Sequence, residues 1–173
     1  MPTAEISLNL PDENATEQLG AQLAAILLES VSSNKNNGLD SNTGATIYLR
    51  GELGAGKTAL VRALLRACGV TSRIKSPSYA LLESYKVSSL YFYHIDFYRF
   101  SDSSEWQDAG FRDLFRPDAV ILIEWPQKAG DQLPAPDLLI ELSYEGSGRS
   151  ARVQAETKRG ATWLRNLSKN CPQ

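Results

Sequence analysis

The alternation of hydrophobic and polar residues predicts the first elements of an α/β fold. Residues 5–10 (E-I-S-L-N-L) alternate strictly, which is the period of a half-buried strand. A helix is predicted after Pro11, with Asp12 or Asn14 as its cap, because the next hydrophobic residues recur at helical spacing. Residues 31–45 are rich in serine, asparagine and glycine and offer nothing to bury, so they predict an exposed connection.

Strands and helices continue to alternate in the rest of the pattern. The clearest strand is residues 119–124, which is apolar on both faces up to its final glutamate, as in a parallel strand covered on both sides. The other predicted elements are, in chain order, a strand over 46–49, a helix from Thr58 to a C-cap glycine at Gly69, strands over 79–87 and 90–96, short helical segments within 102–115 capped by Ser103 or Ser104, a hairpin of 138–144 and 152–156, and a helix over 162–168.

The segment between the second predicted strand and its helix carries the most specific chemistry. Residues 51–58 read G-E-L-G-A-G-K-T, which matches the P-loop pattern G-x-x-x-x-G-K-[ST] at every fixed position. Its glycines let backbone N–H groups approach phosphate oxygens, and the helix that follows points its positive dipole end at the same anion. Lys57 is predicted to reach the β- and γ-phosphates, and the Thr58 hydroxyl to bind Mg²⁺. The predicted nucleotide-binding residues are Gly51, Glu52, Leu53, Gly54, Ala55, Gly56, Lys57, Thr58 and Ala59.

This motif and the order of elements predict the fold class. We expect a single P-loop NTPase-type domain over residues 1–173, with a mixed, mostly parallel sheet flanked by helices, a C-terminal β-hairpin and a closing helix.

Composition and charge narrow the function classes. A net charge of −2 gives no overall attraction for nucleic acid, so any RNA contact would need a local basic patch or a partner. Cys68 and Cys171 suggest no disulfide framework or metal site, and a single histidine, His94, excludes a His-rich zinc site. The sequence shows neither a signal-peptide pattern nor an apolar run of membrane length, which predicts a cytoplasmic protein without membrane contact.

Two acids follow apolar runs at predicted strand ends. Asp96 follows the aromatic run 90–95, and Glu124 follows the aliphatic run 120–123. A P-loop nucleotidase needs a carboxylate at such a position to hold Mg²⁺ or to orient water, and we expect both acids to face the phosphates. Which of them binds the metal directly is left open, and a solvated charge at a strand end is the alternative for each.

The loop of residues 73–79 comes directly after the P-loop helix, where switch loops occur in several P-loop families. Lys75, Ser76 and Ser78 are candidates to sense the γ-phosphate, and Pro77 would stiffen the turn before Tyr79. A solvated surface loop is the alternative.

Other classes of P-loop protein fit less well. A GTPase carries an N-K-x-D motif after its acidic strands, but the only Asn-Lys pair here, residues 34–35, precedes the P-loop and lacks the aspartate. A small-molecule kinase needs an arginine-rich lid. Arg99, Arg112 and Arg116 lie in a segment that is short and aromatic.

Four motifs together resemble the bacterial TsaE family, the ATPase of tRNA threonylcarbamoyladenosine biosynthesis. They are G-E-L-G-A-G-K-T at 51–58, K-S-P-S-Y at 75–79, H-I-D-F-Y-R at 94–99 and I-E-W-P at 123–126, and the resemblance covers about residues 5–155. It implies that Asp96 is the Walker B-type acid, that Glu124 is a metal or water ligand, that Trp125 lies beside the nucleotide and that residues 75–79 form a switch. It also implies phosphate and Mg²⁺ binding by Lys57 and Thr58.

The chain departs from the family pattern at three positions. Ser78 and Ala80 stand where threonines are usual, and Gln107 stands where an acid is expected, whereas Glu105 and Gly110 match.

The function that the resemblance implies is that of a weak ATPase acting with TsaB and TsaD. Those partners transfer a threonylcarbamoyl group to N6 of the adenosine next to the anticodon, so tRNA would be met indirectly through the complex. ATP hydrolysis would support repeated turnover, and Arg99 is the best candidate for an arginine acting on the γ-phosphate. Arg62, Arg66, Arg73 and Lys75 are either a patch near tRNA or TsaD, or solvated charges. A nucleotide-gated assembly module whose hydrolysis is incidental, and a small-molecule kinase, are the alternative functions.

Overall fold

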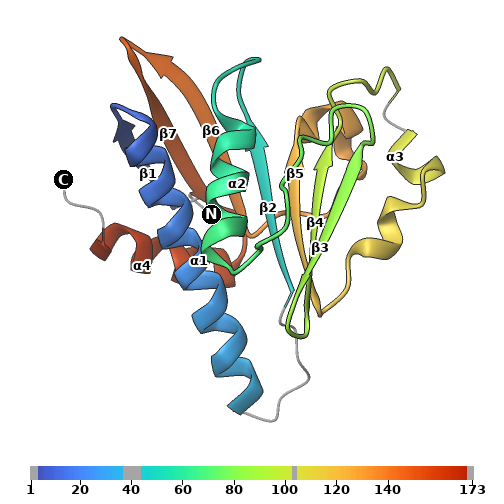
Figure 1. Ribbon diagram of the computed structural model, residues 1–173, viewed down its shortest axis with the longest axis horizontal. Coiled ribbons are helices and arrows are strands. Elements are labelled where there is room, and N and C mark those ends of the chain that lie inside the picture. The colour runs from blue at the N-terminus through green and yellow to red at the C-terminus, as the bar shows by residue number, and fades with distance from the viewer. Residues whose placement is uncertain (1–3, 37–43, 103–104, 171–173) are drawn as a thin grey trace.

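One seven-stranded sheet with helices on both faces forms the body of the protein, as the computed structural model of residues 4–36, 44–102 and 105–170 shows (Figure 1). The strand order is β1-β7-β6-β2-β5-β4-β3. Strands β6, β2, β5 and β4 are parallel neighbours at the centre, whereas β7, β1 and β3 are added antiparallel at the sides. The strands are β1 (Glu5–Leu10), β2 (Ala45–Arg50), β3 (Leu82–Val87), β4 (Leu90–Asp96), β5 (Ala119–Glu124), β6 (Leu138–Glu145) and β7 (Gly148–Ala155). The predicted α/β fold with its mixed sheet is confirmed.

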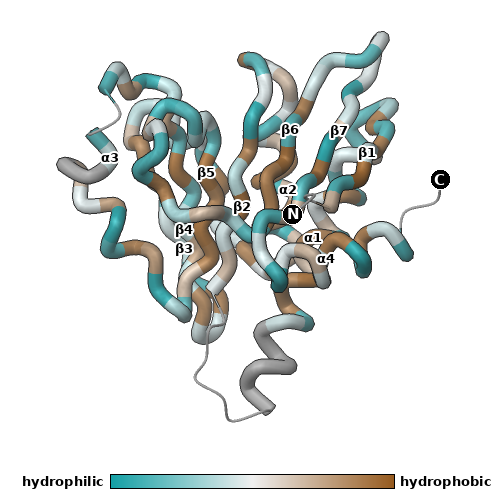
Figure 2. The backbone as a smooth tube through the Cα atoms, turned by 180° about the vertical axis from the view of Figure 1, so that it is seen from behind, coloured by the Kyte–Doolittle hydropathy of each residue, from teal (hydrophilic) through white to brown (hydrophobic). Residues whose placement is uncertain are grey.

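Two hydrophobic cores lie on opposite faces of the sheet. The larger contains residues of α1, α2 and α4, and the smaller contains residues of α3 and of the 3-10 segments η1 and η2. Strand β5 supplies both, because Val120 and Leu122 face the first core while Ile121 and Ile123 face the second. Figure 2 shows the resulting hydrophobic colouring along the central strands. The helical elements are α1 (Glu13–Asn36), α2 (Lys57–Ala67), α3 (Glu105–Asp108), η1 (Phe111–Leu114), η2 (Pro126–Gln132) and α4 (Lys158–Asn170).

Close packing of α1 on α2 fixes the helix that follows the P-loop. A Cβ atom added at Gly20 would lie 2.5 Å from Ala63 Cβ and 2.9 Å from the Leu64 backbone nitrogen. A larger side chain at Gly20 would therefore push α1 away from α2. The two small residues hold α2 firmly against its neighbour.

Helix α1 starts as predicted but ends later. The Ala15 N–H donates to Asp12 Oδ1 at 2.9 Å, which identifies Asp12 rather than Asn14 as the cap. The predicted connection from residue 31 is wrong at its start, because the helix continues to Asn36. Serine and asparagine weaken a helix without breaking it, and the first glycine after Gly20 is Gly38. Residues 37–43 lie outside the described part of the chain.

Three other predicted boundaries are also wrong. Strand β3 begins at Leu82 rather than at residue 79, because Leu81 N–H donates to the Pro77 carbonyl at 2.8 Å and closes a turn there. Strand β7 begins at Gly148, so the hairpin turn is shorter than predicted. The closing helix α4 is longer at both ends than the predicted 162–168. The predicted caps Ser103 and Ser104 lie outside the described residues.

No helix within the described ranges is long and apolar enough to cross a membrane.

Candidate functional site

The carboxyl ends of β2, β4 and β5 meet at one edge of the sheet. The P-loop begins where β2 ends, and β5 lies between β2 and β4 with all three strands parallel. Asp96 and Glu124 are register partners at the ends of β4 and β5, and Glu124 is also paired with Leu49 of β2. The structure therefore brings the two predicted acids together beside the P-loop.

The P-loop turns tightly against β6 before entering α2. Gly51 has a φ of 148°, and a Cβ atom there would lie 2.5 Å from the Leu142 carbonyl oxygen. Gly56 precedes the helix with a φ of 105°, and no side chain within the described residues caps the α2 N-terminus. The first N–H groups of α2 are thus left for a ligand, in the position where a helix favours an anion.

The β6–β7 hairpin holds the P-loop from outside. Arg149 donates from Nε to the Ala55 carbonyl at 3.0 Å and from Nη2 to the Gly54 carbonyl at 3.2 Å. The Tyr144 hydroxyl donates to the Leu53 carbonyl at 3.0 Å. Because these contacts draw the loop carbonyls outward, they stabilise a loop conformation whose N–H groups are available to phosphate. Sequence reasoning missed both residues.

Lys57 is buried within the loop that it follows. Its Nζ donates to the carbonyls of Gly51 at 2.6 Å and Glu52 at 2.9 Å, and the side chain is only 4% exposed. Burial lowers the pKa of Lys57, against the charges of Glu124 and Asp96, which raise it. The ammonium group therefore lies at the P-loop, within reach of an anion bound there.

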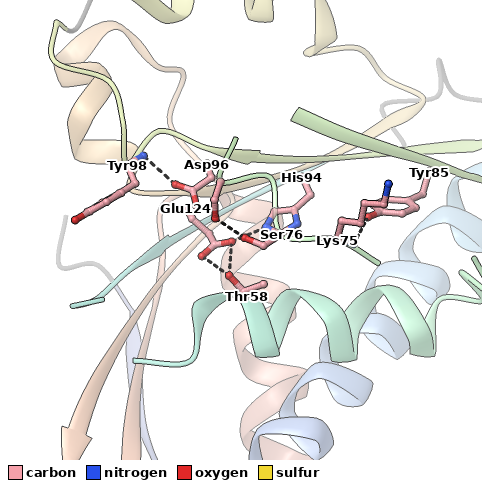
Figure 3. Close-up of polar contacts among 9 residues, drawn as sticks. Thr58, Lys75, Ser76, Tyr85, His94, Asp96, Tyr98 and Glu124 are labelled. Carbon is pink, nitrogen blue, oxygen red and sulfur yellow. Dashed lines mark hydrogen bonds and ion pairs between the residues drawn. The ribbon is translucent and has the colours of Figure 1, made fainter. Parts of the chain in front are cut away.

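Glu124 connects the P-loop helix to β4 (Figure 3). The Thr58 hydroxyl lies 3.0 Å from each Glu124 carboxylate oxygen, and His94 Nε2 lies 2.6 Å from Glu124 Oε2. A hydroxyl beside a carboxylate offers the hard oxygen atoms that Mg²⁺ prefers, and this ion usually completes its shell with substrate phosphates and water. Thr58 and Glu124 thus fit a magnesium ion.

His94 is a component of the site that sequence reasoning did not assign. It is completely buried, and its Nδ1 has no hydrogen-bond partner among the described residues. A buried polar atom without a partner costs on the order of 1–3 kcal/mol. A signal was present in the sequence, because His94 precedes Asp96 by two residues on a strand and so lies on the same face.

Asp96 is held beside the loop that follows β4. Its Oδ1 accepts a hydrogen bond from the Tyr98 N–H at 2.8 Å. Burial raises the pKa of Asp96, the Tyr98 hydrogen bond lowers it, and the nearby charge of Glu124 raises it again. A buried carboxylate of this kind can orient a water molecule or accept its proton.

Trp125 directly follows β5 and has a left-handed backbone conformation, with a φ of 59°. Its N–H donates to the Leu49 carbonyl at 3.2 Å, and its ring lies 4.4 Å from Lys57 Nζ and 5.1 Å from the Tyr98 ring. Backbone conformations that are unfavourable for a bulky residue are concentrated at functional sites. The structure thus places Trp125 directly against the P-loop lysine.

The predicted switch loop contributes two hydroxyl groups near these residues. Ser76 Oγ and Ser78 Oγ lie 2.7 Å apart, and Figure 3 shows the Ser76 side chain in front of the region of His94 and Glu124 in this view. Lys75 lies farther along, where its N–H donates to the Tyr85 hydroxyl at 3.3 Å.

The outer part of this loop is at the surface. Tyr79 is 85% exposed, and the Arg99 guanidinium carbon lies 4.4 Å from the centre of its ring. In this structure Arg99, the best candidate for an arginine acting on the γ-phosphate, therefore contacts the predicted switch loop.

One residue of the predicted basic patch has a structural role. Arg66 Nη1 donates to the Val70 carbonyl at 2.8 Å and to the Ser72 carbonyl at 2.7 Å. Arg66 thus supports the end of α2, where Gly69 takes the left-handed conformation predicted for a C-cap glycine, with a φ of 107°.

A groove of about 1040 Å³ opens on the other side of the P-loop. It runs along α2 between α1 and the β6–β7 hairpin, and its lining includes Gly54, Gly56, Ala59, Thr16 and Arg149. Ligand pockets of drug-sized molecules have volumes of roughly 300–1,000 Å³. The groove is therefore large enough for a nucleoside, and it is continuous with the P-loop.

The family model for the threonylcarbamoyl adenosine biosynthesis protein TsaE matches residues 10–153. The chain belongs to the TsaE family. It is 36% identical to TsaE of Haemophilus influenzae over 151 residues, which cover 87% of this chain and 90% of that protein. It is 35% identical to TsaE of the cyanobacterium Synechocystis over 134 residues, which cover 73% of each chain.

A solved structure also has the same fold. The crystal structure of YdiB from Bacillus subtilis superposes with a TM-score of 0.74 at 22% identity, covering 98% of this chain and 97% of that one. The resemblance to the TsaE family that the four motifs indicated is thus confirmed, and so is the fold class.

Proposed function

We propose that this protein is an ATP-binding and slowly hydrolysing P-loop ATPase that serves threonylcarbamoyladenosine modification of tRNA, together with TsaB and TsaD. The observation that carries the proposal is the contact of Thr58, the last residue of a complete P-loop motif, with the buried Glu124. The chain belongs to a family named for threonylcarbamoyladenosine biosynthesis, and this membership supports the proposed role in that modification.

The proposed roles follow from where the side chains lie. The P-loop N–H groups and Lys57 bind and neutralise the phosphates, and Thr58 and Glu124 hold Mg²⁺. When bound, the ion would withdraw charge from the phosphate oxygens. Asp96 orients the attacking water, and the groove beside Ala59 receives the nucleoside. Catalysis is then positioning together with stabilisation of charge.

Slow hydrolysis alone would become faster with partners if docking completes the site. The exposed loop residue Tyr79 is available for such docking, because 85% of its surface is open to solvent. Since the net charge of the chain is −2, we propose that tRNA is reached through the partner complex and not by this chain alone. The proposed compartment is the cytoplasm, where this modification would meet its tRNA substrate.

The proposal is tested by tRNA modification over many turnovers. TsaB and TsaD are supplied with the chain and either ATP or a non-hydrolysable analogue, and a reaction without the chain is the control. We expect modification to stop after about one turnover without the chain, and the analogue not to restore it. If the analogue supports as many turnovers as ATP, the protein is a nucleotide-gated assembly factor whose hydrolysis is incidental.

Substitution of the two acids is expected to separate hydrolysis from nucleotide binding. Asp96→Asn and Glu124→Gln should each lower ATP turnover by about 10²-fold or more, as for other groups that position or stabilise the reacting atoms. Nucleotide binding measured in EDTA should persist, because the P-loop itself is unchanged. The readouts are phosphate release and equilibrium binding of a fluorescent nucleotide.

The matched control for these two variants is Asp113→Asn, an exposed acid in η1, which should keep wild-type turnover. Wild-type rates of tRNA modification with Asp96→Asn and Glu124→Gln, despite lost hydrolysis, would contradict a role for hydrolysis.

A further inference from the structure

We infer that His94 is a positioning residue which, through Glu124, sets the affinity of the site for the divalent cation. The inference deepens the proposed function and rests on it, because it requires Thr58 and Glu124 to hold that cation. The contact that carries it is the 2.6 Å approach of His94 Nε2 to Glu124 Oε2.

The hydrogen bond from His94 restricts what the Glu124 carboxylate can do. An ionised carboxylate only accepts, so Nε2 carries the hydrogen and donates to Oε2. The Thr58 hydroxyl lies 3.0 Å from both carboxylate oxygens, and His94 contacts only Oε2, so Oε1 is the oxygen that Thr58 alone contacts among the described residues. His94 thus fixes the carboxylate with both oxygens facing the Thr58 hydroxyl and leaves Oε1 as the less engaged oxygen, available to a cation shared with that hydroxyl.

The two strands that carry His94 and Glu124 hold both partners rigidly. Strands β4 and β5 are parallel neighbours, with His94 opposite Leu122 and Asp96 opposite Glu124. His94 is completely buried and Glu124 is 2% exposed, so close packing restricts both side chains to their present rotamers. An orientation fixed in this way is present before any ligand binds, which favours affinity.

A purely structural role does not account for a histidine at this position. Its Nδ1 lies buried without a partner among the described residues, whereas an apolar side chain of similar size would leave no such atom. The neighbouring Phe92, two residues earlier on the same face of β4, shows that this face accepts a large apolar residue. The useful property of His94 is therefore the hydrogen bond that it gives to Glu124.

A side chain that hydrogen-bonds to a metal-binding carboxylate changes the affinity of the site for the metal. Removing such a partner typically lowers metal affinity by about 10- to 100-fold. We therefore expect loss of the His94 hydrogen bond to raise the Mg²⁺ concentration needed for half-maximal effect by about 10-fold or more, with little change in nucleotide binding when Mg²⁺ is absent.

Two substitutions that introduce the same amide group on side chains of different length test the inference. The amide nitrogen of glutamine in His94→Gln can take the place of Nε2, whereas the shorter asparagine in His94→Asn cannot reach Glu124. Binding of a fluorescent ADP analogue is measured in EDTA and then across a Mg²⁺ titration. We expect His94→Gln to respond to Mg²⁺ within about threefold of wild type, and His94→Asn to need at least about tenfold more.

Phe92→Leu is the matched control, because it loosens the same strand without touching the Glu124 hydrogen bonds. It should unfold at a lower temperature and keep the wild-type Mg²⁺ response. His94→Leu replaces the asparagine variant where that variant does not fold.

The outcomes distinguish this inference from the proposed function. If folded His94→Asn or His94→Leu keeps the wild-type Mg²⁺ response, the inference is overturned. The same holds if neither variant folds, since the histidine would then serve the fold. If the wild-type chain binds no adenine nucleotide at all, the proposed function itself fails.

Discussion

Replacing Lys57 with alanine is expected to lower ATP turnover by about 10²-fold or more, the effect of removing one preorganised charge-stabilising donor. The ammonium group lies against the carbonyls of Gly51 and Glu52, and Trp125 closes it off from one side. Charge that develops on the γ-phosphoryl group would be met by this cation in a largely buried position, where electrostatic interactions are stronger than in water.

The measurement is phosphate release in the presence of TsaB and TsaD, beside equilibrium binding of the nucleotide. Lys128→Ala, which removes an exposed lysine of η2, is the control and should behave as wild type. Because Lys57→Ala also removes two hydrogen bonds from the loop, its melting temperature is measured as well. Normal hydrolysis by a folded Lys57→Ala variant would show that the P-loop is not the catalytic site.

Replacing Asp137 with alanine is expected to cause the largest loss of stability among the polar residues. Asp137 is 4% exposed and joins three elements. Its Oδ2 accepts from the Thr46 N–H at 3.1 Å and from Arg159 Nη2 at 2.8 Å, while its Oδ1 accepts from the Thr157 hydroxyl at 2.6 Å. Removing the carboxylate takes away the acceptor of these three donors, which should lower the free energy of unfolding by about 3 kcal/mol. We expect no larger loss because Arg159 is partly exposed and can still be hydrated.

Urea unfolding followed by circular dichroism gives the free energy of unfolding for this comparison. Glu141→Ala is the matched control, because it removes the exposed ion pair in which Arg152 Nη2 lies 2.6 Å from Glu141 Oε2. Exposed pairs of this kind contribute about 1 kcal/mol or less. If the two variants lose the same free energy of unfolding, the Asp137 network stabilises the fold no more than an exposed ion pair does.

The parts of the structure that follow from local pattern were predictable from the sequence. Strand β5 is aliphatic on both faces and is buried on both, and the P-loop lies between the strand and the helix that its motif requires. The proximity of Asp96 and Glu124 was also predictable. Parallel strands end at the same edge of a sheet, so acids that follow two of them meet there.

Contacts between distant segments could not be predicted in the same way. In the sequence Arg149 looks like an ordinary charged residue of a hairpin strand. In the structure it donates to two P-loop carbonyls, 94 and 95 residues away in the chain. Asp137 comes directly before β6 like many acids beside a strand, but its donors come from β2 and from the start of α4, which lie 91 and 20–22 residues away in the chain. Such roles depend on which elements become neighbours, and that is decided by packing of the whole chain.

Element boundaries were wrong where propensity is weak or a turn intervenes. The serines and asparagines after residue 30 do not favour a helix, but α1 carries on through them to Asn36. Tyr79 reads as the start of a strand, but the Pro77–Leu81 turn delays β3. In both cases the local composition allows either structure, and contacts with neighbouring residues determine where the element ends or begins.

The position of β1 at the end of the sheet has a consequence for how the protein is made. Within the described sheet β1 is bonded only to β7, and Glu5 lies opposite Gln154, 149 residues later in the chain. A nascent chain emerges from the ribosome with its first strand complete long before the partner strand exists, and contacts of such long range form slowly. Residues 5–10 therefore wait without their hydrogen-bonding partner strand until the last hairpin has been synthesised.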